Sequence, residues 1–398
     1  MEKSRKPKIR FRGYTDDWEQ RELGKLVSVS MCRRIFKEQT SESGDIPFYK
    51  IGTFGSVADA FISKELFEEY KSKYPYPKKG DILISASGSI GRTVEFRGEN
   101  EYFQDSNIVW LNHDERLSNS FLKCFYSVVK WSGIEGSTIK RLYNDNILNT
   151  PISVPSISEQ EKVGACFATL DNLITLHQRK LDKLINVKKS MLEKMFPKQG
   201  STVPEIRFTG FTNDWEQRKL GELLTRYTDE VNVPHNGYER LGIRSHAKGT
   251  FHSYVSEGHE LQTGKMHKVA ADKFIVNITF GWEHAVAVTD KNDAGKLVSH
   301  RFPQYSLSEN LYSKFFKYII LDDKFKHHLW LSSPGGAGRN RVLKLDEMLE
   351  YKIKIPNVQE QQKIAEVLMD LDNLITLHQC ELEKLQNIKK SMLEKMFV

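Results

Sequence analysis

Few residues of this chain have the spacing that catalysis requires. Glu350 and Lys352 form a Glu-x-Lys pair, one half of a nuclease motif, but no Pro-Asp precedes them at a suitable distance. Every Gly-Lys pair is followed by Leu or Met, whereas a phosphate-binding loop needs Ser or Thr there. No Pro-Pro occurs, so the Asn/Asp-Pro-Pro-aromatic motif of DNA methyltransferases is absent as well. The sequence therefore predicts a binding protein that has no catalytic residues.

Cysteine and histidine give no metal-ligand pattern. Cys32, Cys124, Cys166 and Cys380 are isolated from one another, so we expect free and mostly buried thiols instead of disulfides or structural zinc. His177 and His378 occupy equivalent places in a repeated segment described below, but two histidines alone are too few for a zinc site. We predict no metal in this chain.

Basic and polar side chains gather in loops that also contain Gly and Ser. Cations bind phosphates, and Arg or Ser can read base edges, so this pattern favours double-stranded DNA as a partner. Lys140 and Arg141 fall opposite Arg341 and Val342 at an offset of 201 residues, which places a basic loop at the same point of both halves. An ordinary solvated surface is the alternative for any one patch. The predicted DNA-binding residues are Arg33, Arg34, Ser87, Arg92, Lys140, Arg141, Arg244, His246, Lys248, Lys265, Lys268, Arg339 and Arg341.

Composition is that of a globular protein with several domains. The 398 residues are 39% hydrophobic and 28% charged, and the net charge of +7 is mildly basic. No apolar run approaches the roughly 20 residues of a membrane span, and no apolar segment follows the basic start. We expect a cytoplasmic protein without a membrane partner.

The chain is a tandem duplication. Residues 9–26 and 206–223 are identical at 13 of 18 positions, and residues 170–196 and 371–397 at 22 of 27. The segments from Pro155 and from Pro356 also align. The middles between these repeated blocks are dissimilar, as GDILISASGSIGRTVEF (80–96) against ADKFIVNITFGWEHAVAV (271–288) illustrates. Random sequence divergence would have changed the repeated blocks and the middles to a similar degree. The pattern therefore indicates one task performed twice on two different targets.

Each half ends in a predicted long helix, residues 158–196 in the first, with Ser158 and Glu161 as a capping box. Apolar residues recur in steps of four and three, which is a heptad seam. Each helix of about 39 residues would be about 58 Å long, and we expect the two to pair antiparallel with pseudo-two-fold symmetry. His177 and His378 would then meet as polar register markers, unless they are solvent-edge residues. The predicted seam comprises Phe167, Leu170, Ile174, His177, Leu181, Leu184, Leu368, Leu371, Ile375, His378, Leu382 and Leu385.

A second apolar stripe of the first helix is left over: Leu173, Leu176, Val187, Leu192 and Phe196. Packing on a globular module and a groove for a partner helix both remain open for it. The middles combine strand-like segments at 81–87, 92–96, 107–111, 273–280 and 284–290 with helix-like segments at 61–74, 118–131 and 311–330.

The predicted fold class is α+β, with two mixed α/β globular modules that are each followed by a long helix. The expected domains are recognition modules at 1–154 and 201–355, and spacer helices at 155–200 and 356–398.

This organisation resembles the specificity subunit of type I restriction–modification systems. The resemblance rests on the DWEQR-x-LG blocks (Asp17–Gly24 and Asp214–Gly221), the P…EQ-x-K entries (Pro155–Lys162 and Pro356–Lys363) and the LDNLITLHQ…MLEKMF helices. It implies two target-recognition domains that each read half of a split DNA site, with the helices as spacer. It also implies docking of two methyltransferase subunits and of translocase/endonuclease subunits, which would carry S-adenosylmethionine, ATP and Mg²⁺.

Two other readings of the sequence stay open. The chain could be an enzyme, a nuclease or methyltransferase with unfamiliar motifs. It could also be a coiled-coil adaptor whose modules bind protein without recognising a DNA sequence.

Overall fold

The computed structural model describes residues 6–132, 141–261, 264–335 and 341–397, and it divides into two compact units. The first unit is Met1–Arg179 with His378–Val398, and the second is Lys180–Leu377. Each unit therefore contains one module and a part of each long helix, whereas the predicted boundaries lay at the helix ends. Among the described residues, no helix is long and apolar enough to cross a membrane.

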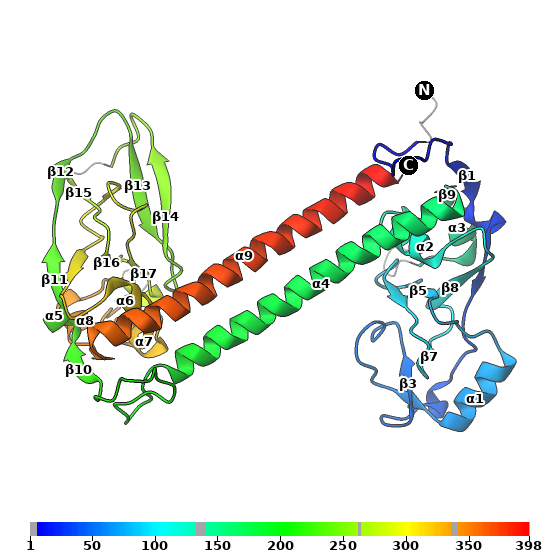
Figure 1. Ribbon diagram of the computed structural model, residues 1–398, viewed down its shortest axis with the longest axis horizontal. Helices are drawn as coiled ribbons and strands as arrows, with labels where there is room; N and C mark the ends of the chain where they lie inside the picture. Colours follow the sequence, from blue (N-terminus) through cyan, green and yellow to red (C-terminus); the bar gives the residue numbers. More distant parts are fainter. Residues whose placement is uncertain (1–5, 133–140, 262–263, 336–340, 398) are drawn as a thin grey trace. The chain divides into compact units, whose positions relative to one another are not determined.

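The first unit begins with the module between β1 and β9, followed by α4 (Figure 1). Its strands are β1 (Glu19–Glu22), β2 (Val27–Ser30), β3 (Ile46–Tyr49), β4 (Phe61–Ile62), β5 (Ile82–Ser85), β6 (Thr93–Glu95), β7 (Tyr102–Phe103), β8 (Ile108–His113) and β9 (Pro151–Val154). Its helices are α1 (Lys64–Lys73), α2 (Asn119–Tyr126), α3 (Asn144–Leu148) and α4 (Ile157–Lys194), of which α4 continues into the second unit.

The second unit has more strands than the first, but its helices follow a similar order. The strands are β10 (Glu216–Lys219), β11 (Leu224–Tyr227), β12 (Glu230–Asn232), β13 (Tyr238–Ile243), β14 (Thr250–Val255), β15 (Lys265–Lys268), β16 (Lys273–Val276), β17 (Val286–Val288), β18 (Leu297–Val298), β19 (Gln304–Leu307) and β20 (Lys352–Ile355). The helices are α5 (Leu220–Leu223), α6 (Ser313–Ile319), α7 (Asp323–Leu331), α8 (Leu345–Leu349) and α9 (Val358–Met396).

The central sheets of the two units have the same strand order. The first unit pairs β2-β8-β5-β6 and the second pairs β11-β19-β16-β17, and each unit adds a two-stranded ribbon, β1-β9 or β10-β20. The remaining sheets differ, because the first unit has β4-β3-β7 and the second has five strands in the order β12-β15-β18-β13-β14. The duplication therefore preserves the central sheet and the ribbon, and the modules diverge in the additional sheet.

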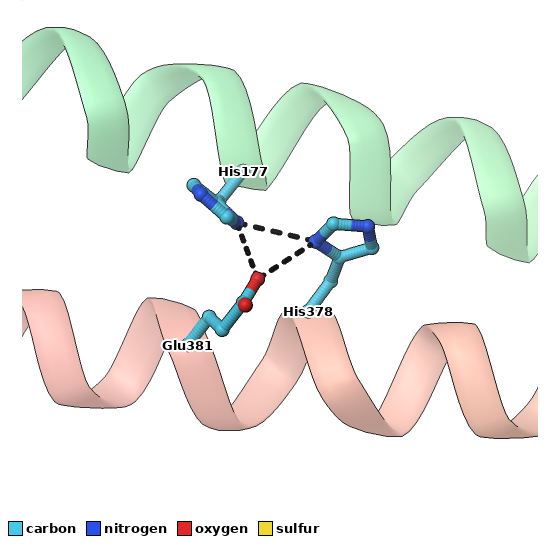
Figure 2. A group of neighbouring side chains, drawn as sticks. All are labelled: His177, His378 and Glu381. Atoms are coloured by element: carbon cyan, nitrogen blue, oxygen red, sulfur yellow. Dashed lines mark hydrogen bonds and ion pairs between the residues drawn. The ribbon is translucent and has the colours of Figure 1, made fainter.

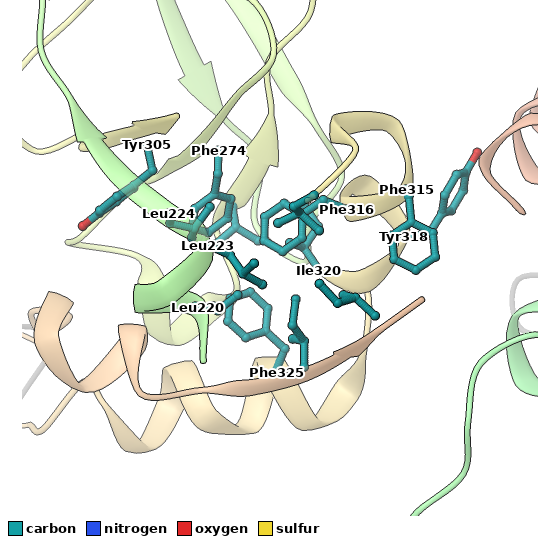
Figure 3. Close-up of a cluster of buried hydrophobic side chains, with 14 of the residues drawn as sticks. Leu220, Leu223, Leu224, Phe274, Tyr305, Phe315, Phe316, Tyr318, Ile320 and Phe325 are labelled. Atoms are coloured by element: carbon teal, nitrogen blue, oxygen red, sulfur yellow. The ribbon is translucent and has the colours of Figure 1, made fainter. Parts of the chain in front are cut away.

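Each core is completed by the end of a long helix from the other repeat. Trp18 packs edge-on against Phe121 and against Phe397, from the segment after α9, with ring centroids 5.8 and 6.0 Å apart. In the second unit, Trp215 packs against Phe315 and Phe196 at 5.9 Å each, and Met195 is buried in the same cluster. Figure 3 shows the aromatic and leucine side chains of this second core.

Two buried interactions attach the start of each long helix to its module. Glu159 accepts two hydrogen bonds from Arg10, at 2.7 and 2.8 Å, and Glu360 accepts two from Arg207, at 2.8 Å each. The next residue, Gln160 or Gln361, accepts a hydrogen bond from the residue that directly precedes a module helix, α2 or α6. Gln160 accepts from the backbone N–H of Ser118 at 2.9 Å, and Gln361 accepts from that of Tyr312 at 2.9 Å.

Several local predictions need correction. The α4 helix begins at Ile157, so Ser158 lies inside it, and the Ser158 hydroxyl contacts the Tyr14 hydroxyl at 3.0 Å instead of forming a capping box. The predicted helix at 311–330 is two helices, because Asp322 caps α7 by accepting from the Lys324 backbone N–H. The thiols of Cys32 and Cys124 are buried, whereas Cys166 is half-buried and Cys380 is exposed, and all four are free.

The Arg10–Glu159 pair gives a first testable prediction. Substitution Glu159→Ala leaves a largely buried guanidinium without its carboxylate, and we expect a cost of about 3 kcal/mol. The loss should raise hydrogen–deuterium exchange in β1, β9 and the first turns of α4, while β10 and β20 stay protected. Glu69→Ala, which removes an exposed ion pair with Lys73, is the control and should leave the exchange of β1 and β9 unchanged. Unchanged exchange in β1 and β9 would show that the pair does not attach the helix.

Candidate nucleic-acid interface

In the first unit, Arg141 is held against the connection between β5 and β6. Its backbone forms an isolated bridge with Ser87, and the following residue, Leu142, donates from its N–H to the Ala86 carbonyl at 2.8 Å. The Arg141 guanidinium donates to the Ser106 hydroxyl at 3.1 Å, and the ring of Tyr143 lies 5.6 Å from it. A planar donor group is thus fixed beside the loop that follows a central strand.

The other predicted residues of this unit have varied surroundings. Ser87 is buried and donates to the Asn107 side chain at 2.7 Å, so its hydroxyl already has a partner. Arg92 is exposed, lies at the far end of the same β5–β6 connection, and donates to the Gly55 carbonyl at 3.2 Å. Arg33 and Arg34 are exposed and lie over the rings of Tyr74 and Phe36, at 5.2 and 5.7 Å.

The second unit repeats the backbone link with different side chains. Leu343 donates from its N–H to the Ile278 carbonyl at 2.9 Å, as Leu142 does to Ala86. Ile278 belongs to the connection between β16 and β17, which contains a short 3-10 helix, η3 (Gly281–Glu283). Arg341 reaches this connection, with its guanidinium 5.8 Å from the Trp282 ring and 5.1 Å from the Trp330 ring. Both units therefore bring an arginine to the same connection of the central sheet.

The β13–β14 turn lies against the same 3-10 helix. His246, in the left-handed conformation with φ of 62°, donates from its backbone N–H to the Glu283 carbonyl at 2.9 Å. The Ser245 hydroxyl donates to the Glu283 carboxylate at 2.6 Å. Burial lowers the pKa of His284, which therefore stays neutral near pH 7 and can donate to the Ile320 carbonyl at 2.7 Å. These bonds join the turn, η3 and the end of α6 into one surface.

The remaining basic residues of this unit lie on the five-stranded sheet. Arg244 contacts the Thr250 carbonyl and lies over the Phe251 ring at 5.4 Å, and Lys248 is exposed in the same turn. Lys265 and Lys268 are exposed on β15, and Lys265 pairs with Glu230 at 3.3 Å. Two predicted residues, Lys140 and Arg339, lie outside the described residues.

Sequence reasoning missed the aromatic residues around Arg341. Trp282, His327 and Trp330 line a depression of about 460 Å³ together with Asp323 and Lys326, and the His327 and Trp330 rings stack at 5.9 Å. Trp330 remains 45% exposed, although the His327 ring stacks on it and the Arg341 guanidinium lies over it. The i, i+3 spacing of His327 and Trp330 was the available signal, but Trp282 joins them only through the fold.

The predicted seam residues are the less exposed positions of both long helices. Phe167, Leu181, Leu368, His378 and Leu382 are buried, and Leu170, Ile174, His177, Leu184, Leu371, Ile375 and Leu385 are half-buried. In the first unit, Asp171 of α4 pairs with Lys389 of α9, and the His177 and His378 Nδ1 atoms are 3.2 Å apart. In the second unit, Lys188 pairs with Asp372 at 2.5 Å. Residue numbers fall along α9 as they rise along α4, so the segments are antiparallel in each unit.

The second apolar stripe divides into two parts. Leu192 and Phe196 pack against the core of the second unit, which is the packing alternative. Leu173 and Leu176 are 39% and 61% exposed in the first unit, and their repeat equivalents Leu374 and Leu377 are 42% and 52% exposed in the second. The groove alternative stays a prediction for this pair of leucines, which recurs in both units.

Comparison with known proteins identifies the family. The model of the type I restriction modification DNA specificity domain matches residues 15–186 and again residues 212–387. A putative type I restriction enzyme specificity subunit of Haemophilus influenzae is 61% identical over 158 residues, which is 39% of this chain and 41% of that protein. The MjaVIII specificity subunit of Methanocaldococcus jannaschii is 24% identical over 330 residues, 79% of this chain and 74% of that protein.

A solved structure has the same fold. The type I restriction–modification S subunit of M. genitalium superposes with a TM-score of 0.59 at 14% identity, covering 99% of each chain. Because the family model covers most of the chain, this protein belongs to the type I restriction–modification DNA specificity family and contains two of its domains. The resemblance inferred from the sequence is therefore confirmed, and the comparisons do not favour the adaptor alternative.

Proposed function

We propose that this chain is a non-catalytic subunit that recognises a split DNA sequence, with one half-site for each unit. The observation that carries the proposal is the repeated backbone link, Leu142 to Ala86 and Leu343 to Ile278, beside which each unit presents an arginine. Arg141 is surrounded by Ser106 and Tyr143, whereas Arg341 lies between Trp282 and Trp330. A common scaffold with different side chains around the arginine suits two readers of different base sequences.

The long helices support a spacing role. The α4 helix has 38 residues and α9 has 39, which correspond to about 57 and 58 Å at 1.5 Å per residue. Half-sites read from one face of the duplex are about 34–36 Å apart, or one helical turn. Helices of this length exceed that separation, and the difference leaves room for the width of the two modules.

The recurring exposed leucines support docking of two copies of one partner. Leu173 with Leu176, and Leu374 with Leu377, offer the same pair of apolar side chains once in each unit. We infer that each pair is covered by one methyltransferase subunit, and that translocase/endonuclease subunits join the same complex. In this proposal S-adenosylmethionine, ATP and Mg²⁺ bind to those partners, so the purified chain alone should not methylate DNA.

The arginine in the second unit gives a sharp test of DNA recognition. In the complex with the methyltransferase, Arg341→Ala should weaken binding to the cognate duplex by about 10- to 100-fold, the value of a good base contact. Arg341→Lys should not restore binding, because an ammonium cannot stack between two indoles or donate in a planar fork. Lys291→Ala, an exposed cation in another turn, is the control. Wild-type affinity of Arg341→Ala in a gel-shift titration would contradict the assignment.

Exchange of one module tests the division of the target. Replacing residues 27–150 by the matching segment of another family member should change only one half of the methylated motif found by methylome sequencing. The reciprocal exchange of residues 224–350 should change only the other half, because each segment starts at the first strand of its central sheet. A change of both halves in either variant would refute independent reading.

The leucine pairs predict the stoichiometry of docking. The double variant Leu173→Asp/Leu176→Asp should lose one of two methyltransferase subunits in native mass spectrometry, since charge is placed where apolar area is buried. The matched variant Leu374→Asp/Leu377→Asp should lose the other. Ile185→Asp is the control, because Ile185 is 45% exposed but its repeat equivalent is Gln386. Retention of two subunits by both double variants would place the docking surface elsewhere.

A further inference from the structure

Three side chains of the two long helices converge in the first unit. His177 of α4 and His378 of α9 turn their Nδ1 atoms toward each other and toward the Glu381 carboxylate (Figure 2). The two Nδ1 atoms are 3.2 Å apart, and the Glu381 Oε2 atom lies 3.1 Å from that of His177 and 3.3 Å from that of His378. The cluster is thus an almost equilateral triangle of three electron-pair donors.

Hydrogen bonds alone cannot satisfy this triangle. Each imidazole Nδ1 carries at most one hydrogen, and the Glu381 carboxylate carries none, so at most two hydrogens serve three contacts. If both Nδ1 atoms carry a hydrogen and donate to Glu381, neither can accept a hydrogen bond from the other. The contact between the two rings then contains no hydrogen bond. A cation in the middle instead accepts one lone pair from each of the three atoms, and it does so with both imidazoles neutral.

The dimensions suit a tetrahedral transition-metal ion. Zinc binds imidazole nitrogen and carboxylate oxygen at about 2.0–2.2 Å, so neighbouring ligands of a tetrahedral zinc are about 3.3–3.5 Å apart. The three sides of the triangle are 3.2, 3.1 and 3.3 Å, which needs only a slight expansion. Mg²⁺ and Ca²⁺ require mainly oxygen ligands, so two imidazole nitrogens select a zinc-like ion.

The surroundings leave room for an ion to enter and for a fourth ligand. The His378 side chain is 8% exposed and that of His177 is 22% exposed, so both rings are held by the helix pair. The Glu381 side chain is 43% exposed, which opens the third corner to solvent. Three protein ligands and one water would complete the tetrahedron.

The third ligand also explains why a metal site was not expected from the sequence. His378 and Glu381 are an i, i+3 pair on one face of α9, whereas His177 comes from a helix 201 residues away in the chain. The repeat equivalent of Glu381 is Lys180, so the duplicated sequence supplies the carboxylate only once. One carboxylate and two histidines provide ligands for one ion.

We propose that His177, His378 and Glu381 bind one zinc-class divalent ion, which cross-links α4 and α9 in the first unit. This site is independent of the proposed DNA recognition, because none of the three residues belongs to the candidate interface. The ion would fix the register of the two helix segments at the histidine layer, which otherwise interrupts the apolar seam.

The test uses the full chain, freed of metal by a chelator and titrated with Co²⁺ followed by Zn²⁺. We expect one equivalent of Co²⁺ to give the visible absorption bands of a tetrahedral site and Zn²⁺ to abolish them. His177→Gln, His378→Gln and Glu381→Gln should each weaken Co²⁺ binding by at least about 100-fold, since changing even an outer-shell partner costs 10- to 100-fold. Zn²⁺ should raise the melting temperature of the wild-type chain but not that of these three variants.

Two matched variants control for other ligands on the same helix. Cys380→Ser removes an exposed thiol, and Glu383→Gln removes an exposed carboxylate outside the triangle. Both should bind Co²⁺ like the wild type. Circular dichroism shows whether each glutamine variant keeps its helices, so that lost binding can be read as lost ligands. Absence of tetrahedral bands, unchanged binding in the three ligand variants, or loss of binding in Cys380→Ser would overturn the proposal.

Discussion

The structure depends on one constraint: each long helix has an apolar seam that it cannot bury alone. The α4 and α9 segments bury their seams against each other in both units, with an Asp–Lys pair at the edge of each contact. Because the pairing is antiparallel, the end of α9 lies beside the start of α4 in the first unit. The end of α4 lies beside the start of α9 in the second unit.

Antiparallel pairing makes each core depend on residues from the other repeat. Met396 and Phe397 pack with Trp18 and Phe121 in the first unit, and Met195 and Phe196 pack with Trp215 and Phe315 in the second. A single repeat would therefore leave Trp18 or Trp215 without part of its covering. Domain boundaries drawn along the sequence at residues 154 and 355 separate segments that share a core, which is why the compact units divide at Arg179 and His378.

Patterns confined to neighbouring residues were predictable from the sequence. The heptad spacing predicted both long helices to within about two residues, and the central strands β5, β6, β16 and β17 lie inside the segments that looked extended, whereas β8 continues two residues beyond the predicted segment at 107–111. The break between α6 and α7 escaped prediction, because the apolar periodicity continues through the Asp322 cap. The five-stranded sheet also escaped, because its pairings join short strands that are distant in the chain, such as β12 with β15 and β13 with β18.

The candidate interface was predictable in its position but not in its composition. A basic loop before the last strand can be seen in each half, and the structure places Arg141 and Arg341 at that point. The Ser106 and Trp330 side chains that contact these arginines come from segments that no local pattern connects to them. The same holds for Glu381, which meets His177 only because the helices are antiparallel and in one register.

The two repeats remain alike where the long helices must fit each other, and they differ in the additional sheet of each module. Arg10–Glu159 and Arg207–Glu360 are equivalent pairs with nearly equal distances, because each fixes the start of a helix that the other repeat must match. The β4-β3-β7 sheet and the five-stranded sheet have no such partner, so their strands are free to differ. The two units must bind different targets, but their long helices must pair in one register. Such a protein needs a constant attachment of the helices and an additional sheet that can vary.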